Sequence, residues 1–176
     1  MQSKSTWSSR LDRTSRTFFV GRQTELEVFE EFLDDSTNDH LHVWGPAGSG
    51  KSSLLEQFAD IASSRGLSIW NIDGSSDPQP ERLVASLTAE ASFDLVSIDT
   101  FEQLGSLHRW FQSEFFPSLP EDVSVVTAGR QPLSDREWSN DVVSVELGDL
   151  TDQECRQFLE LRGVPARFHD ELVDYS

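Results

Sequence analysis

Residues 45 to 52 match the phosphate-binding pattern G-x-x-x-x-G-K-[ST]. In such a loop the glycines let successive backbone N–H groups converge on phosphate oxygens, the lysine reaches the outer phosphates, and the hydroxyl residue is a ligand of Mg²⁺. The pattern therefore predicts that the chain binds a nucleoside triphosphate together with Mg²⁺. The residues expected at this cofactor site are Gly45, Pro46, Ala47, Gly48, Ser49, Gly50, Lys51, Ser52 and Ser53.

A second candidate group lies at the end of an apolar run over residues 93–99, whose last residue is Asp99. An aspartate at the carboxyl end of a strand beside a phosphate loop can hold Mg²⁺, so Asp99 and Ser52 are the expected metal ligands. The alternative is that Asp99 stands there only because turns favour aspartate. The phosphate loop favours the metal role over this alternative.

The segments on either side of the loop have the order that a phosphate-binding loop requires. Residues 41–44 are a short apolar run typical of a buried strand, and residues 53–62 carry apolar side chains at helical spacing. A strand, the loop and a helix thus follow one another, which places the helix N-terminus under the phosphates. The alternative interpretation is a glycine-rich turn that only links a strand to a helix.

The rest of the chain alternates between strand and helix patterns. This alternation predicts an α/β fold of the P-loop NTPase type, with a mostly parallel five-stranded sheet sandwiched by helices and the nucleotide at the carboxyl ends of the strands. A capping box formed by Thr151 and Glu154 predicts the start of another helix, and Gly163 predicts its end. The other predicted strands are 67–72, 93–99, 123–128 and 142–147, and the other predicted helices are 24–33, 81–90 and 103–116.

Composition limits the function further. The chain has 176 residues, the length of one ordinary domain, and a formal net charge of −17, which argues against direct nucleic-acid binding by this domain. Only Lys4 and Lys51 are lysines. The single cysteine, Cys155, excludes an internal disulfide and fits a reducing compartment. No apolar run is long enough for a membrane span, and the Ser- and Arg-rich segment 1–17 is expected to be a disordered leader. The predicted location is therefore the cytoplasm.

Three short motifs together resemble one family. They are Phe19-Val20-Gly21-Arg22, the stretch Asp99 to Glu102, and the stretch Val126 to Arg130. In these motifs the chain resembles the signal-transduction ATPases with numerous domains (STAND), which are regulatory relatives of the AAA-type P-loop ATPases. It looks most like the nucleotide-binding module of bacterial multidomain regulators in that group. The resemblance covers residues 18 to about 164 and implies a nucleotide-binding domain over 18–148, followed by the beginning of a helical lid over 149–176.

The resemblance also implies roles for individual residues. Phe19, Val20 and Gly21 would line an adenine pocket, and Arg130 would be the sensor that touches the γ-phosphate. An arginine at a strand end can form forked, charge-assisted bonds to phosphate oxygens. The alternatives are an ordinary core aromatic for Phe19 and a surface arginine that caps a turn for Arg130.

One position departs from the pattern of this family. AAA-type ATPases usually have a glutamate directly after the metal aspartate to orient the attacking water, and here that residue is Thr100. Threonine is no base near neutral pH, so Glu102 becomes the candidate general base. The alternative for Glu102 is a solvated charge at a helix start, where negative side chains are favoured. We therefore expect ATP hydrolysis to be slow or absent.

Three functions remain open at this stage. The first is an ATP- and Mg²⁺-dependent switch module with weak ATPase activity, in which Lys51, Asp99, Glu102 and Arg130 are the catalytic residues and the nucleotide state controls self-association or an effector domain. The second is an interaction scaffold that binds nucleotide without hydrolysing it. The third, a small-molecule kinase, is the least favoured, because the segment after Arg130 offers only Arg136 before the next strand.

Overall fold

The structure is a computed structural model that describes residues 19–35, 37, 39–76, 78–88, 93–134, 138 and 142–173. The predicted leader over residues 1–17, the predicted end of the helix at Glu90, and Arg136 lie outside these ranges. The chain divides into two compact units. The larger unit runs from Thr24 to Leu147, and the described part of the smaller unit comprises residues 19–23 and 148–173.

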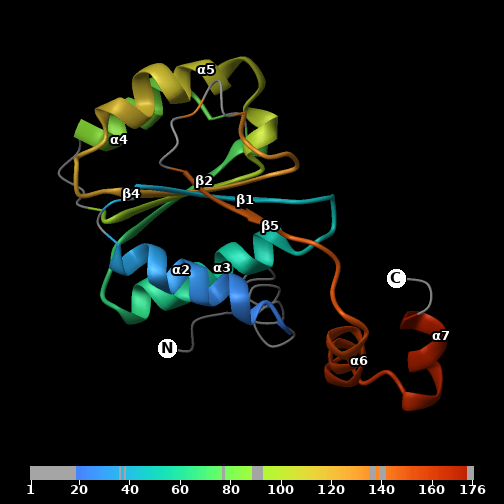
Figure 1. Cartoon of the computed structure of the whole chain (residues 1–176). Coiled ribbons are helices and arrows are strands. Elements are labelled where there is room, and N and C mark those ends of the chain that lie inside the picture. The colour runs from blue at the N-terminus through green and yellow to red at the C-terminus, as the bar shows by residue number, and fades with distance from the viewer. Residues whose placement is uncertain are drawn as a thin grey trace, which may run out of the picture. The chain divides into compact units, whose positions relative to one another are not determined.

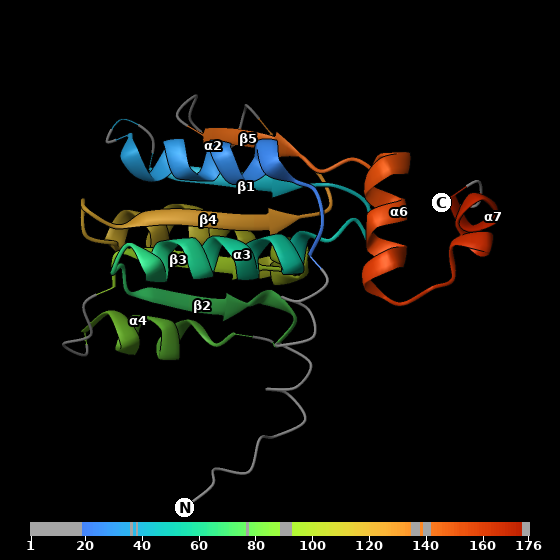
Figure 2. The same cartoon turned by 90° about the horizontal axis from the view of Figure 1, so that it is seen from below.

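A five-stranded sheet forms the centre of the larger unit, with the strand order β2-β3-β4-β1-β5 (Figure 2). Every neighbouring pair of strands is parallel. Each strand matches a predicted one to within two residues, which confirms the α/β sheet expected from the sequence. The strands are β1 (His40–Trp44), β2 (Ile69–Asp73), β3 (Leu95–Asp99), β4 (Ser124–Gly129) and β5 (Val142–Glu146).

Helices cover both faces of this sheet (Figure 1). On one face lie α2 (Gln23–Asp34) and α3 (Lys51–Ser64), and on the other lie α4 (Pro80–Thr88) and the segment around α5 (His108–Trp110). Parallel strands need crossover connections, and α3, α4 and the segment around α5 each lie in such a connection, whereas α2 precedes β1. On the first face the rings of Phe29 and Phe58 stack with their centroids 4.1 Å apart. The core on the opposite face includes Ile72, Leu83, Val96, Ile98, Phe101, Leu104, Phe111, Phe115 and Val123.

The segment after β3 differs from its prediction. One continuous helix was expected over residues 103–116, and this expectation is wrong. The chain instead forms a 3₁₀ segment (Phe101–Leu107), the short α5, a π turn (Phe111–Phe115) and another 3₁₀ turn (Phe116–Ser118). Two physical causes are visible: Gly105 has non-helical angles of φ 52° and ψ −116°, and Phe116 N–H bonds to the carbonyl of Phe111. In that wider turn the ring centroids of Phe111 and Phe116 lie 5.7 Å apart.

The smaller unit contains α6 (Asp152–Leu161) and α7 (His169–Val173). The predicted capping box is confirmed, because the Thr151 side chain accepts from the Glu154 backbone N–H and the Glu154 carboxylate accepts from the Thr151 backbone N–H. Gly163, with φ +72°, follows α6. Among the described residues, no helix is both long and apolar enough to cross a membrane.

Candidate nucleotide site

The phosphate loop lies between the end of β1 and the start of α3. Gly48 and Gly50 have φ values of +85° and +93°, a left-handed conformation that only glycine adopts without cost. The backbone N–H of Gly45 donates to the Gly129 carbonyl at 3.2 Å, which joins the loop to the end of β4. Because α3 begins at Lys51, the partial positive charge of its N-terminus faces the loop. The loop therefore has the backbone that anion binding requires.

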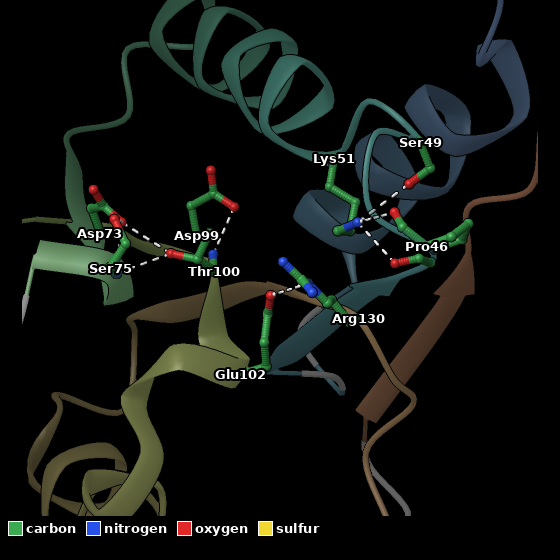
Figure 3. A network of polar contacts seen from close by, with 10 residues as sticks. Pro46, Ser49, Lys51, Asp73, Ser75, Asp99, Thr100, Glu102 and Arg130 are labelled. Carbon is green, nitrogen blue, oxygen red and sulfur yellow. Dashed lines mark hydrogen bonds and ion pairs between the residues drawn. The ribbon is translucent and has the colours of Figure 1, made fainter.

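Lys51 is folded back onto the loop (Figure 3). Its Nζ donates to the carbonyls of Gly45 and Pro46 at 2.8 and 2.7 Å and reaches Ser49 Oγ at 3.3 Å. Partial burial lowers the pKa of Lys51, and the nearby carboxylates of Glu102 and Asp99 oppose this effect. In this structure the ammonium group thus has its hydrogen-bond partners within its own loop.

A cavity of about 280 Å³ is lined by the predicted metal and catalytic residues and by six of the nine predicted phosphate-site residues; Gly45, Pro46 and Ser49 are not in its lining. Ser52 and Asp99 both line it, so two oxygen donors of the kind that Mg²⁺ prefers share one space. This donor set fits the ion, which would take its remaining ligands from water and phosphate. No cluster of three His, Cys, Asp or Glu side chains suited to a metal occurs among the described residues. The lining residues are Ala47, Gly48, Gly50, Lys51, Ser52, Ser53, Asp99, Thr100, Glu102 and Arg130.

Thr100 has an unusual backbone conformation beside Asp99. Its φ is +49°, which is rare for a β-branched residue and costs about 1–3 kcal/mol. Its N–H donates to Asp99 Oδ1 at 2.7 Å, and its hydroxyl donates to Asp73 Oδ1 at 3.0 Å. Figure 3 shows the Thr100 side chain directed toward Asp73 and Ser75. Thr100 therefore connects the ends of β2 and β3.

Asp73 was not predicted from the sequence, and it is connected to this site through its hydrogen bond from Thr100. It pairs with Asp99 in the β2–β3 register and accepts from the backbone N–H and hydroxyl of Ser75 at 2.8 and 2.7 Å. These bonds, together with the one from Thr100, lower the pKa of Asp73. The only sequence signal was an aspartate directly after the predicted strand over residues 67–72, which is close to the signal that identified Asp99.

Glu102 and Arg130 form an ion pair, with Arg130 Nε 2.9 Å from Glu102 Oε1. Their side chains are 28% and 58% exposed, so the pair contributes less than about 1 kcal/mol to stability. Glu102, the candidate base, and Arg130, the candidate sensor, are thus paired at the cavity. A competing anion can separate them at a small cost in free energy.

Phe19, Val20 and Gly21 belong to the smaller unit, so their assignment to an adenine pocket stays a prediction. Val20 is buried, and Gly21 has φ +69° with the Glu154 carboxylate packed against its Cα. The next residue, Arg22, donates through Nη2 to the Gly148 carbonyl at 2.6 Å. Hydrogen bonds from Thr151, and weaker effects of Arg22, lower the pKa of Glu154. Within the smaller unit, this segment is therefore held against the start of α6.

Comparison with known proteins identifies the fold. No protein-family profile matches the chain. The replication initiator DnaA bound to AMPPCP and single-stranded DNA is similar, with a TM-score of 0.62 and 20% identity over 92% of this chain and 58% of that chain. Domain III of DnaA from Thermotoga maritima gives a TM-score of 0.65 at 17% identity, covering 91% of this chain and 79% of that one.

A third similar structure is the RuvB Holliday junction branch migration motor of Thermotoga maritima. Its TM-score is 0.59 at 20% identity, and the match covers 81% of this chain and 50% of that one. The chain thus spans between 50% and 58% of the length of the RuvB structure and of the AMPPCP-bound DnaA structure. At these identities the likeness establishes the fold alone, which is the AAA-type P-loop ATPase fold expected from the sequence.

Proposed function

We propose that this chain is an ATP-binding regulatory module whose conformation or assembly follows its nucleotide state. One observation carries the proposal: Lys51 and Ser52 of the phosphate loop share a cavity with Asp99, Glu102 and Arg130. These residues come from three different segments, and parallel strands bring them to one edge of the sheet. Nucleotides bind at this edge in open α/β sheets. The AMPPCP in the similar DnaA structure supports a triphosphate as the ligand.

Each group in the cavity has a distinct role in this proposal. The loop N–H groups and Lys51 bind the β- and γ-phosphates, and Ser52 and Asp99 hold Mg²⁺, which would neutralise phosphate charge. Arg130 leaves Glu102 and binds the γ-phosphate through its guanidinium. Because only ATP offers that phosphate, the Arg130 contact distinguishes ATP from ADP. Such a differential contact is what biases a two-state element.

Hydrolysis is slow in this proposal. Thr100 cannot act as a base, and its hydroxyl donates to Asp73. Glu102 is the general base once Arg130 releases its carboxylate, since it lines the same cavity. If Glu102 does not act in this way, the chain is the non-hydrolysing scaffold. A measurement of phosphate release separates the two possibilities.

The finer identity of the module belongs to the same proposal. We infer a STAND-type regulator in which Phe19, Val20 and Gly21 contact adenine and residues 149–176 begin a helical lid. Its partners are ATP and ADP, together with a second copy of the chain or an effector domain, in the cytoplasm. The net charge of −17 opposes direct DNA binding by this domain, although a similar DnaA structure holds single-stranded DNA.

Titration calorimetry with ATP and Mg²⁺ tests the proposal. Lys51→Ala removes the ammonium group from the phosphates, and we expect ATP affinity to fall by about 100-fold or more, as for a lost charge-assisted cluster of bonds. Lys4→Ala is the matched control, because Lys4 is the other lysine of the chain. Equal ATP affinity in both variants would overturn the proposal.

A second candidate function is favoured by one further observation. A cavity of about 510 Å³, with His42, His108 and Trp138 in its lining, shares Glu102 and Arg130 with the nucleotide cavity. Such an adjacent space is what a small-molecule kinase needs for its phosphoryl acceptor. A kinase would convert ATP to ADP without releasing inorganic phosphate when supplied with its acceptor. Parallel assays of ADP and free phosphate in the presence of small-molecule mixtures distinguish kinase from ATPase activity.

A further inference from the structure

Two histidines and a threonine form a buried polar chain between β1 and β4. His40 and His42 alternate along β1, and Thr127 is the register partner of His42 on β4. His42 is 1% exposed and Thr127 is fully buried. Polar side chains at the centre of a parallel sheet are costly unless they are hydrogen-bonded, and apolar residues normally fill such positions. The phosphate loop itself does not require these residue types.

The hydrogen bonds that link His40, Thr127 and His42 have a definite direction. A carbonyl oxygen only accepts, so the 3.0 Å contact between His42 Nε2 and the Gln131 carbonyl places the proton of the neutral ring on Nε2. Burial lowers the pKa of His42, which keeps the ring neutral. Nδ1 of His42 then accepts from the Thr127 hydroxyl at 2.7 Å. The same hydroxyl accepts from His40 Nε2 at 2.8 Å.

At its His42 end, this series of hydrogen bonds lies next to Arg130, the candidate sensor. Gln131, whose carbonyl accepts from His42, directly follows Arg130 in the sequence. On the other side of Arg130, a Cβ placed on Gly129 would lie 3.2 Å from His42 Cε1 and 3.7 Å from Glu102 Oε2. The His42 ring therefore contacts both backbone neighbours of Arg130. It reaches neither Lys51 nor the loop through any bond described for its ring nitrogens.

We propose that His42 is a positioning residue for Arg130, and that Thr127, itself bonded to His40, holds the His42 ring in place. In this arrangement the end of β4 is fixed while the Arg130 side chain exchanges Glu102 for the γ-phosphate of ATP. His42 acts through the Gln131 backbone and touches no nucleotide. The inference rests on the proposed ATP-binding function, and it adds a residue group that controls how strongly the module distinguishes ATP from ADP.

The test compares ATP and ADP affinities of the full chain by titration calorimetry. Thr127→Val keeps the side-chain shape but removes the hydroxyl, so the His42 ring loses the hydrogen bond at Nδ1 that holds it in place. We expect the ratio of ATP to ADP affinity to fall by about fivefold, a typical size for one coupling between sites. ADP affinity should change little. Thr127→Ser, which retains the hydroxyl, should restore the ratio.

A double-mutant cycle with Arg130→Ala separates positioning from general destabilisation. If His42 acts through Arg130, then Thr127→Val has no effect on the affinity ratio once Arg130 is absent. The same fivefold change in the Arg130→Ala background, or an equal loss of ATP and ADP affinity, would overturn the inference. His42→Asn, whose shorter side chain cannot reach Gln131, provides a second route if Thr127→Val does not fold.

The outcomes also distinguish this inference from the proposed function. A wild-type chain that binds no ATP contradicts both. A wild-type chain that binds ATP, with a ratio that Arg130→Ala lowers and both Thr127→Val and His42→Asn leave unchanged, contradicts only the positioning role. Thermal unfolding of each variant shows whether the fold is retained.

Discussion

One wall of the nucleotide cavity is the loop between β1 and α3, and the facing wall consists of Asp99 at the end of β3 and residues that follow β3 and β4. The first wall has glycines at the positions that need positive φ and leads into a regular 14-residue helix. The second wall has Thr100 at positive φ, followed by a segment of mixed 3₁₀, α and π geometry. The conformation of the first wall is determined by residues that are neighbours in the sequence. The conformation of the second wall depends on contacts between segments that are distant in the sequence.

We expect the first wall to bind the phosphates and the second wall to respond to which nucleotide is bound. Lys51 and the loop N–H groups would recognise the phosphates of almost any nucleoside diphosphate or triphosphate. Arg130, Glu102 and Thr100 make their contacts with side chains from other strands and turns, so their positions depend on the surrounding fold. We therefore expect substitutions of Arg130, Glu102 and Thr100 to change turnover and discrimination more than affinity.

The largest expected effect is that of Glu102→Gln on ATP hydrolysis. Removing a general base typically lowers a rate by about 100-fold or more, whereas loss of the exposed ion pair with Arg130 changes ATP affinity little. Phosphate release and calorimetry measure the two quantities. Glu114→Gln, at an exposed position, is the control. Unchanged phosphate release in Glu102→Gln would remove Glu102 from catalysis and favour the scaffold.

The next effect concerns Mg²⁺. Asp99→Asn removes the charge proposed to hold the ion, and we expect the Mg²⁺-dependent part of ATP affinity to fall by about tenfold, since bonds to charged groups contribute about 1.5–3 kcal/mol. Asp94→Asn is a matched control near the start of β3, where Asp94 accepts from the Ser68 backbone N–H at 2.6 Å. If ATP binding to Asp99→Asn responds to Mg²⁺ as in the wild type, the two walls do not share the ion.

A smaller effect is expected on stability as the pH falls. Burial, and to a lesser degree His42, lowers the pKa of His40 from 6.5 to about 3. The unfolded chain therefore takes up the proton first, and the stability that neutral His40 provides is complete above pH 6.5 and is lost as the pH falls toward 3. Below pH 6.5 this one group lowers the free energy of unfolding by about 1.4 kcal/mol per pH unit.

Denaturant unfolding at pH 7.5 and at lower pH, within the range that the chain tolerates, measures this slope. His40→Gln is the comparison variant, because its amide can still donate to Thr127 but does not titrate. We expect a shallower pH dependence in that variant. Equal slopes in both proteins would show that His40 titrates normally in the folded chain.

The smallest expected effect is at Thr100. Thr100→Val removes the hydroxyl that bonds to Asp73 and should lower the free energy of unfolding by about 1 kcal/mol. Thr100→Ser keeps the hydroxyl and removes the β-branch, so we expect a change within about 0.5 kcal/mol. Denaturant unfolding compares the two variants. A loss in Thr100→Ser with none in Thr100→Val would mean that the methyl group, rather than the bond to Asp73, stabilises this turn.

The sequence predicted those parts of the molecule that depend on short-range patterns. The loop from Gly45 to Ser52, all five strands and the Thr151 capping box each follow from neighbouring residues. The prediction of one helix over residues 103–116 was wrong because apolar spacing does not reveal a π turn, which here depends on packing among Phe111, Phe115 and Phe116.

Long-range contacts account for what the sequence reading missed at the site. Asp73 and Thr100 are 27 positions apart, and His42 and Gln131 are 89 apart, so nothing local indicated that they would be bonded. The positive φ of Thr100 was equally hidden, because threonine rarely adopts it. His42 within the predicted buried strand over residues 41–44, with His40 just before it, was a signal that could have identified this hydrogen-bonded group.

The self-contained hydrogen bonding of Lys51 has a consequence for ligand choice. Its Nζ already donates to the Gly45 and Pro46 carbonyls, so an incoming anion must replace these partners instead of meeting a bare cation. A lone inorganic phosphate offers few compensating contacts, whereas a triphosphate engages the loop amides, Mg²⁺ and Arg130 at the same time. The loop is therefore expected to favour nucleotide over the simple anions that are abundant in a cell.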